Sequence, residues 1–268
     1  MAKGTFFDRL KHKGRRTLKR TFAIPCADPV LVFGNQKSGT TAIARLLAEA
    51  TGETYSHDML FHNSWRSVQP LYRGETNLQQ IRHALRHEFA RKIIKDPDLT
   101  LCMDDARKTI PKARAVFVVR EPAANIRSML SRLKIRGDKP ALDDEDHDIL
   151  AKLPLWNDVL HPEGDVLGGA SSYIEALARR WNVMSSMAIT HENWMVTIRY
   201  EDFIADKVGE INSLAQNVGL TPNHDISHRV NHQFQGRGSS EAFETFFGTD
   251  NLQTIRSICQ DNAAHFGY

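Results

Sequence analysis

The stretch that decides the fold reads Val30-Leu-Val-Phe-Gly34-Asn-Gln-Lys37-Ser-Gly39-Thr40-Thr41-Ala-Ile-Ala-Arg-Leu46-Leu47. The short apolar run is typical of a buried strand, the glycines indicate a loop, and the apolar residues that follow recur at helical spacing. Strand, loop and helix in this order offer backbone N–H groups and the positive end of a helix to a phosphate. The stretch therefore predicts an anion site at the start of the helix.

The position of the lysine separates this loop from a Walker A loop. A Walker A loop carries its lysine directly after the second glycine, in the pattern G-x-x-x-x-G-K-[ST]. Here Thr40 follows Gly39, and Lys37 lies two residues before that glycine. Because a lysine displaced in this way reaches a different part of the ligand, the loop argues against an ordinary ATPase or kinase.

Charge divides the chain into a basic N-terminal extension (1–22) and a mildly acidic body (23–268). Residues 1–22 contain eight lysines and arginines against one aspartate, whereas the whole chain has a net charge of only +3. We interpret the extension as a solvated segment, with weak contact to an anionic membrane surface as the alternative, and we predict no nucleic-acid partner. With no secretory signal, no membrane-spanning run and only three scattered cysteines, we expect a cytoplasmic protein.

Apolar strand patterns alternate with helical patterns along residues 23–268, which predicts an α/β fold. The length allows one large domain or two small ones, and we select a single domain. The expected architecture is a P-loop-type central parallel sheet flanked by helices, with ligands beyond the carboxyl ends of the strands. The expected strands are 30–33, 92–94, 115–119 and 195–198, and the expected helices are 40–50, 78–91, 123–133, 173–189 and 208–218. Residues 137–169, rich in Asp, Pro and Gly, predict a long loop that is either a substrate-side lid or a surface insertion.

A second motif places a cation at the end of another buried strand. The apolar run 115–119 ends in Arg120, and Ser128 follows eight residues later, about two turns into the next helix. An arginine fork and a nearby hydroxyl can together bind an anion. Taken alone, the pair is more typical of a strand-end ion pair and an incidental serine.

Together the two motifs resemble those of the sulfotransferases that use 3′-phosphoadenosine 5′-phosphosulfate (PAPS). Their 5′-phosphosulfate loop reads like residues 37–41, and their 3′-phosphate site reads like Arg120 with Ser128. Three further segments resemble elements of that family, the first being closest to its tyrosylprotein and carbohydrate branches. They are Ile94-Lys95-Asp96-Pro97, Arg199-Tyr200-Glu201-Asp202-Phe203 and the ending Phe266-Gly267-Tyr268.

The resemblance implies a metal-independent enzyme that moves the sulfuryl group of PAPS to a hydroxyl or amine and releases PAP. It places Lys37 at the bridging oxygen between the sulfur and the 5′-phosphate. It also favours a carbohydrate or glycoconjugate as the acceptor. A capping role for Thr41 at the helix start is the alternative to phosphate binding. The implied nucleotide-binding residues are Lys37, Ser38, Gly39, Thr40, Thr41, Arg120, Ser128, Tyr200, Arg237 and Gly238.

The base that accepts the acceptor's proton is a separate question. Cytosolic relatives carry a histidine where this chain has Pro97, whereas other branches place a carboxylate shortly before an aromatic residue. We therefore select Asp58 as the base, with His57 and His62 in reserve; a purely structural carboxylate at Asp58 is the alternative. The expected acceptor-site residues are Asp58, His62, Trp65, Lys95 and Asp96, with Trp156 and Trp181 as further contacts.

Two other functions fit the same motifs less well. A P-loop kinase or NTPase would require ATP and Mg²⁺, and a non-catalytic PAP-binding protein would bind the nucleotide without transfer. The Lys95–Asp96 segment could also be a structural ion pair rather than part of the acceptor site.

Overall fold

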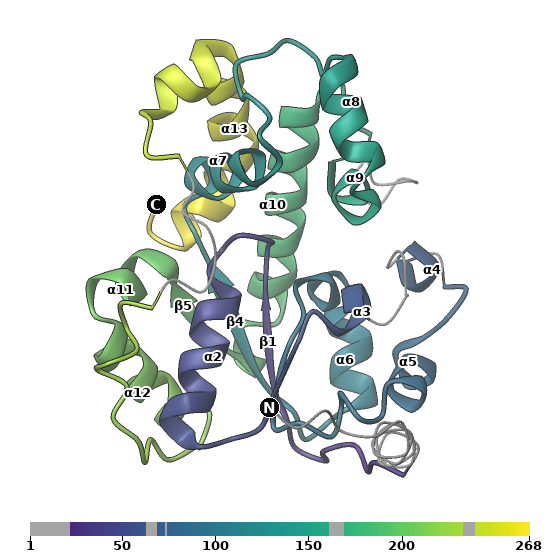
Figure 1. The fold of residues 1–268 in the computed structure, drawn as a ribbon, viewed down its shortest axis with the longest axis vertical. Helices are drawn as coiled ribbons and strands as arrows, with labels where there is room; N and C mark the ends of the chain where they lie inside the picture. Colours follow the sequence, from purple (N-terminus) through teal and green to yellow (C-terminus); the bar gives the residue numbers. More distant parts are fainter. Residues whose placement is uncertain (1–21, 63–68, 73, 161–168, 233–238) are drawn as a thin grey trace, which may run out of the picture.

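The computed structural model describes residues 22–62, 69–72, 74–160, 169–232 and 239–268. Five parallel strands form one sheet in the order β2-β3-β1-β4-β5, with β1 at its centre (Figure 1). The strands are β1 (Val30–Gly34), β2 (Tyr55–His57), β3 (Ile93–Lys95), β4 (Arg114–Val119) and β5 (Met195–Arg199). The predicted α/β class and central parallel sheet are thus confirmed. The strand β2 was not expected from the sequence.

Side chains of β1 alternate between two hydrophobic cores, one on each face of the sheet. Val30 and Val32 pack against α2 (Thr40–Thr51), α11 (Tyr200–Ala205) and α12 (Lys207–Asn217). Leu31 and Phe33 pack into the second core with α5 (Leu78–Ala84) and α6 (Met103–Thr109). Because both faces are covered, every residue of β1 is buried, as its continuous apolar run predicts.

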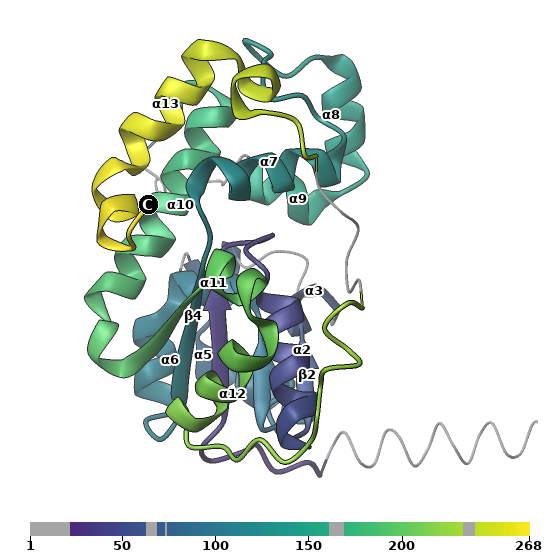
Figure 2. The same cartoon turned by 90° about the vertical axis from the view of Figure 1, so that its left-hand side faces the viewer.

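A group of helices lies beyond the carboxyl ends of the strands (Figures 1 and 2). It consists of α7 (Pro122–Leu133), α8 (Asp144–Ala151), α9 (Pro154–Leu160), α13 (Phe243–His265) and the start of α10 (Tyr173–Thr190), which then continues alongside the sheet. The remaining elements are α3 (Met59–His62), α4 (Gln69–Tyr72), η1 (Pro97–Cys102) and η3 (Glu192–Trp194). The space where parallel-sheet proteins bind their ligands therefore has helices above it and the loops that follow the strands below it.

The expectation of an unbroken loop over 137–169 is wrong, because this segment contains α8 and α9. Asp143 and Asp146 form a reciprocal capping box at the start of α8, and Lys139 binds both carboxylates at 2.7 Å. Acidic residues in the first turn also interact favourably with the positive end of the helix. The acidic run that reads as solvated loop in the sequence is therefore the start of a helix.

Candidate active site

The loop after β1 has the backbone shape of an anion cradle. Gly34 has φ 141°, and a Cβ there would lie 2.5 Å from the carbonyl oxygen of Val118. Gly39, with φ 99°, is the N-cap of α2 and supplies no side-chain cap. Thr41 lies inside the first turn, so the expected alternative of a capping threonine is not what the helix uses. The amide end of α2 therefore faces the loop with no capping side chain at its N-cap.

Arg120 connects the second motif to this loop. Its Nη1 donates a hydrogen bond to the carbonyl oxygen of Lys37 at 3.0 Å, and its guanidinium lies 4.5 Å from the centre of the Tyr200 ring. That ring in turn covers Gly39, where a Cβ would lie 2.3 Å from the Tyr200 ring. Within the described residues, the buried Nε of Arg120 has no hydrogen-bond partner. A buried donor of this kind is rare and points to an anion.

Lys37 lies in a strongly cationic environment. Burial lowers the pKa of Lys37, and the positive charges of Arg132, Arg120 and Lys95 lower it further. Like charges gather in this way where a site holds an anion. The predicted partner Ser128 lies buried on α7, the helix that begins directly after Arg120. The structure thus gathers the cations of the two motifs at one end of the sheet.

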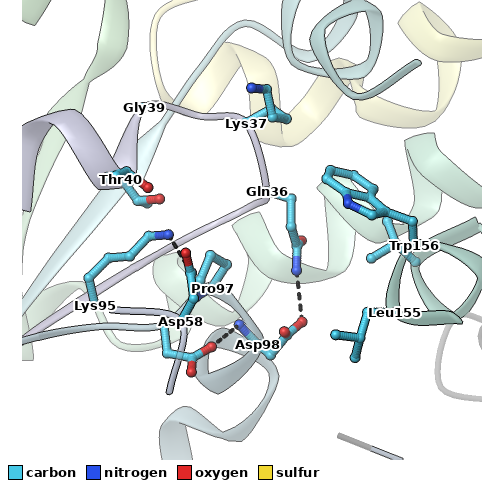
Figure 3. Close-up of a pocket in the computed structure, with 13 residues that line it drawn as sticks. Gln36, Lys37, Gly39, Thr40, Asp58, Lys95, Pro97, Asp98, Leu155 and Trp156 are labelled. Atoms are coloured by element: carbon cyan, nitrogen blue, oxygen red, sulfur yellow. Dashed lines mark hydrogen bonds and ion pairs between the residues drawn. The ribbon is translucent and has the colours of Figure 1, made fainter. Parts of the chain in front are cut away.

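A pocket of about 210 Å³ opens beside the loop (Figure 3). The loop and the start of α2 form one side of it, and the residues after β2 and β3 form another. Helix α9 supplies an apolar wall, so the segment expected to be a loop contributes to the pocket. The lining residues are Gln36, Lys37, Gly39, Thr40, Thr41, Asp58, Lys95, Asp96, Pro97, Asp98, Leu155, Trp156 and Val159.

Asp58 and Lys95 form an ion pair in this pocket. Lys95 Nζ lies 2.6 Å from Asp58 Oδ1, and the Asp58 amide donates to the Lys95 carbonyl oxygen at 2.9 Å. The Lys95 side chain is 4% exposed, whereas that of Asp58 is 31% exposed. Asp58 has φ 47°, a left-handed conformation at the end of β2. The carboxylate selected from the sequence is therefore accessible from the pocket and anchored at one oxygen.

Asp96 lines the same pocket, but its carboxylate is hydrogen-bonded to backbone amides. Its carboxylate accepts hydrogen bonds from the amides of Leu60 and Asp98, both at 3.1 Å, and caps η1. Burial raises the pKa of Asp96, as do the negative charges of Asp98 and Asp58. The ion pair of Lys95 is formed with Asp58, so a structural Lys95–Asp96 pair is not what the fold contains.

Some of the other predicted site residues belong to the part of the chain that the structure describes, and the rest do not. His57 stacks on Tyr55, with ring centres 5.2 Å apart, and is absent from the pocket lining. The backbone of His62 ends α3. Trp156 lines the pocket, whereas Trp181 is buried and donates to the Arg120 carbonyl oxygen at 2.9 Å. Trp65, Arg237, Gly238 and residues 1–21 lie outside the described residues.

The last two motifs contact each other at the end of the sheet. Glu201 accepts a hydrogen bond from the Tyr268 hydroxyl at 2.5 Å and another from the Glu121 amide at 3.2 Å. The Arg199 guanidinium lies 4.5 Å from the centre of the Tyr268 ring. The C-terminal motif thus fixes the segment that carries Tyr200. Both motifs are recognisable in the sequence, whereas their pairing is visible only in the fold.

Sequence reasoning did not select Gln36, Asp98, Leu155 or Val159, which also line the pocket. The signal for Gln36 was its place beside Lys37, and the signal for Asp98 was its place two residues after Asp96. In the part of the chain that the structure describes, no group of three or more His, Cys, Asp or Glu residues is arranged to hold a metal ion. Over the same residues, no helix is both long and apolar enough to span a membrane.

Comparisons with known proteins give one family model and several solved structures of similar fold. A family model described as "Sulfotransferase domain" matches residues 27–241. No curated protein matches the chain by sequence. Among solved structures, the sulfotransferase STF9 of Mycobacterium avium is similar, with a TM-score of 0.58 and 11% identity over 96% of this chain and 81% of that one. Mouse sulfotransferase SULT7A1, solved with PAP, gives a TM-score of 0.45 and 14% identity over 93% of this chain and 82% of that one.

Proposed function

This chain belongs to the sulfotransferase domain family, and from that premise we propose that it transfers the sulfuryl group of PAPS to a hydroxyl or amine of a carbohydrate or glycoconjugate. The observation that carries the proposal is the contact of Arg120 with the loop at Lys37. PAPS differs from ATP in carrying a 3′-phosphate in addition to its 5′-phosphosulfate, and Arg120 supplies a cation for that phosphate at a second strand end.

The residues present fit the donor at three points. The N-terminus of α2 has no side-chain cap, so its amides suit the 5′-phosphate. The close contact of Gly39 with Tyr200 brings an aromatic ring next to the loop, where it can pack against the nucleotide. The unpaired Nε of Arg120, with Ser128 on α7, would hold the 3′-phosphate.

PAPS supplies a sulfuryl group attached to a good phosphate leaving group. A new bond forms between the acceptor oxygen or nitrogen and sulfur, and the bond from sulfur to the phosphate oxygen breaks. Lys37 stabilises the negative charge that grows on that departing oxygen. Asp58 takes the proton from the acceptor, while Lys95 keeps the carboxylate in place. In this mechanism fixed cations and backbone amides stabilise the negative charge of the departing phosphate, and no metal ion is required.

The wall formed by α9 supports an uncharged acceptor with an apolar face, such as a sugar ring. Trp156 and Leu155 lie across the pocket from Lys95 and Thr40, with Gln36 between them (Figure 3). The aromatic ring can cover the apolar face of a sugar, while Asp58 accepts from its hydroxyl groups.

Replacing Trp156 by alanine is expected to raise the acceptor KM about 10-fold, the size of effect expected from losing one buried aromatic contact. PAP affinity should stay within about two-fold, because the donor contacts lie on the opposite side of the pocket. Steady-state kinetics and calorimetry with PAP measure the two effects. Asn157→Ala is the matched control, since Asn157 is on the same helix and does not line the pocket. An unchanged acceptor KM in Trp156→Ala would contradict the proposed acceptor wall.

The function itself is tested with sulfur-labelled PAPS and three acceptors: an N-acetylglucosamine oligosaccharide, octyl glucoside and 4-nitrophenol. We expect label to appear in the oligosaccharide or the glycoside. Label in 4-nitrophenol alone would overturn the carbohydrate assignment while keeping the reaction. PAP binding without transfer to any acceptor would favour a non-catalytic PAP-binding protein.

A further inference from the structure

We propose that Arg180, on α10, is a positioning residue for sulfuryl transfer, holding the phosphate loop at Gln36 and the segment after β3 at Asp98 at a fixed spacing. The inference rests on the proposed function, because this spacing matters only where a donor and an acceptor react. Arg180 is absent from the pocket lining and acts through two residues that are part of it, Gln36 and Asp98.

The side chains of Arg180, Gln36 and Asp98 are hydrogen-bonded to one another. Arg180 donates to Gln36 Oε1 from Nε at 3.3 Å and from Nη2 at 3.0 Å. The same Nη2 donates to Asp98 Oδ1 at 3.3 Å, and Gln36 Nε2 donates to Asp98 Oδ1 at 2.7 Å. Figure 3 shows the Gln36–Asp98 bond crossing from the loop to the segment after β3. Three elements distant in sequence are therefore joined next to the reacting groups.

Burial and charge explain why an arginine is needed at this point. The Arg180 side chain is 3% exposed and that of Asp98 is 20% exposed. Burial raises the pKa of Asp98, and the Arg180 charge acts in the opposite direction. The planar guanidinium can bond two acceptors at a fixed angle, which an ammonium group cannot do. Arg180 therefore neutralises the charge of Asp98 and also holds Gln36 and Asp98 at a fixed angle. An experiment must separate these two roles.

The backbone of the loop has separate anchors on its other side. Asn125 Nδ2 donates to the Gln36 carbonyl oxygen at 2.9 Å, and Arg120 donates to that of Lys37 at 3.0 Å. Neither contact involves Arg180, so we expect both to remain when Arg180 is replaced. Loss of the Arg180 hydrogen bonds to Gln36 and Asp98 should therefore leave nucleotide affinity nearly unchanged. It should also misplace the loop relative to the acceptor, which lowers kcat.

The experiment compares Arg180→Gln, Gln36→Met and the control Arg179→Gln, using whichever of the three acceptors the wild-type chain converts fastest. Gln36→Met breaks this set of hydrogen bonds without leaving a buried charge unpaired. For both test variants we expect kcat to fall about 30-fold, with PAP affinity within about three-fold. Arg179 is 38% exposed and pairs with Glu175, so its variant should match the wild type. Wild-type kcat in Gln36→Met would overturn the proposal.

The double variant Arg180→Gln with Asp98→Asn separates positioning from charge. It removes the buried carboxylate along with its counter-charge, so the melting temperature lost in Arg180→Gln should recover, while kcat stays low. Recovery of wild-type kcat as well would overturn the proposal and leave Arg180 a structural counter-ion. Absence of any transfer by the wild-type chain is a separate result, because it contradicts the proposed function and this inference with it.

Discussion

Replacing Lys37 by methionine is expected to lower kcat by about 10³-fold, the size of loss seen when one preorganised group that stabilises a growing negative charge is removed. The cationic cluster with Arg120, Arg132 and Lys95 persists in this variant, so PAP affinity should fall less than 10-fold. Steady-state kinetics with PAPS and calorimetry with PAP separate the two effects. A similar loss in kcat and in PAP affinity would assign Lys37 to ground-state binding instead.

The pH dependence of kcat gives a second measure of Lys37. Its pKa is lowered, so the cationic form is present below that value and is lost as pH rises through it. Activity should therefore decline at a lower pH than an ordinary lysine would give, and Lys37→Met should lack this decline. Lys134→Met is the matched control, because Lys134 also has a left-handed backbone (φ 62° against 65° at Lys37) but lies at the exposed end of α7.

Replacing Asp58 by asparagine is expected to lower kcat by about 10²- to 10³-fold, since general-base catalysis is worth that much. Asparagine suits the test better than alanine, because Asp58 has φ 47° and asparagine tolerates the left-handed region. The amide oxygen can still accept from Lys95, which is almost fully buried. PAP affinity should stay within about three-fold, because the base acts on the acceptor.

The rival role for Asp58 is that of a structural counter-ion for Lys95. The control is Asp28→Asn, which removes the carboxylate of a more exposed ion pair with Lys92, at 2.8 Å, before the start of β1 and β3. If Asp58 is only structural, both variants will lose stability and keep near-normal turnover. The proposed base requires turnover to fall in Asp58→Asn alone.

The strands and helices with strong apolar patterns were predictable, and those defined by tertiary contacts were not. The continuous run at β1 is buried on both faces and reads clearly as a strand. In contrast, β2 is three residues long and contains Ser56 and His57, so its sequence has no strand signal. Helix α13 escaped prediction because Gly248, with φ 68°, interrupts it and its apolar residues follow no single face. Short or kinked elements depend on the sheet and helices around them.

The site was predictable where its residues follow a strand directly. Lys37 and Arg120 lie at the carboxyl ends of β1 and β4, and parallel strands bring such ends together. Arg180 has no such signal, because it is one of several charged residues in a helical pattern, and only the packing of α10 reveals its contact with Gln36 and Asp98. The same is true of α9, whose role as a pocket wall depends on how the chain folds back over the loop.

The most direct test of the PAPS assignment is calorimetry that compares PAP with adenosine 5′-phosphate and with Mg·ATP on the same preparation. We expect PAP to bind about 100-fold more tightly than either, because one buried arginine bonded to a phosphate contributes about 2–3 kcal/mol. Arg120→Met should remove that advantage and leave the affinity for adenosine 5′-phosphate nearly unchanged. Binding of Mg·ATP with no response to PAP would contradict the assignment and point to a kinase or NTPase.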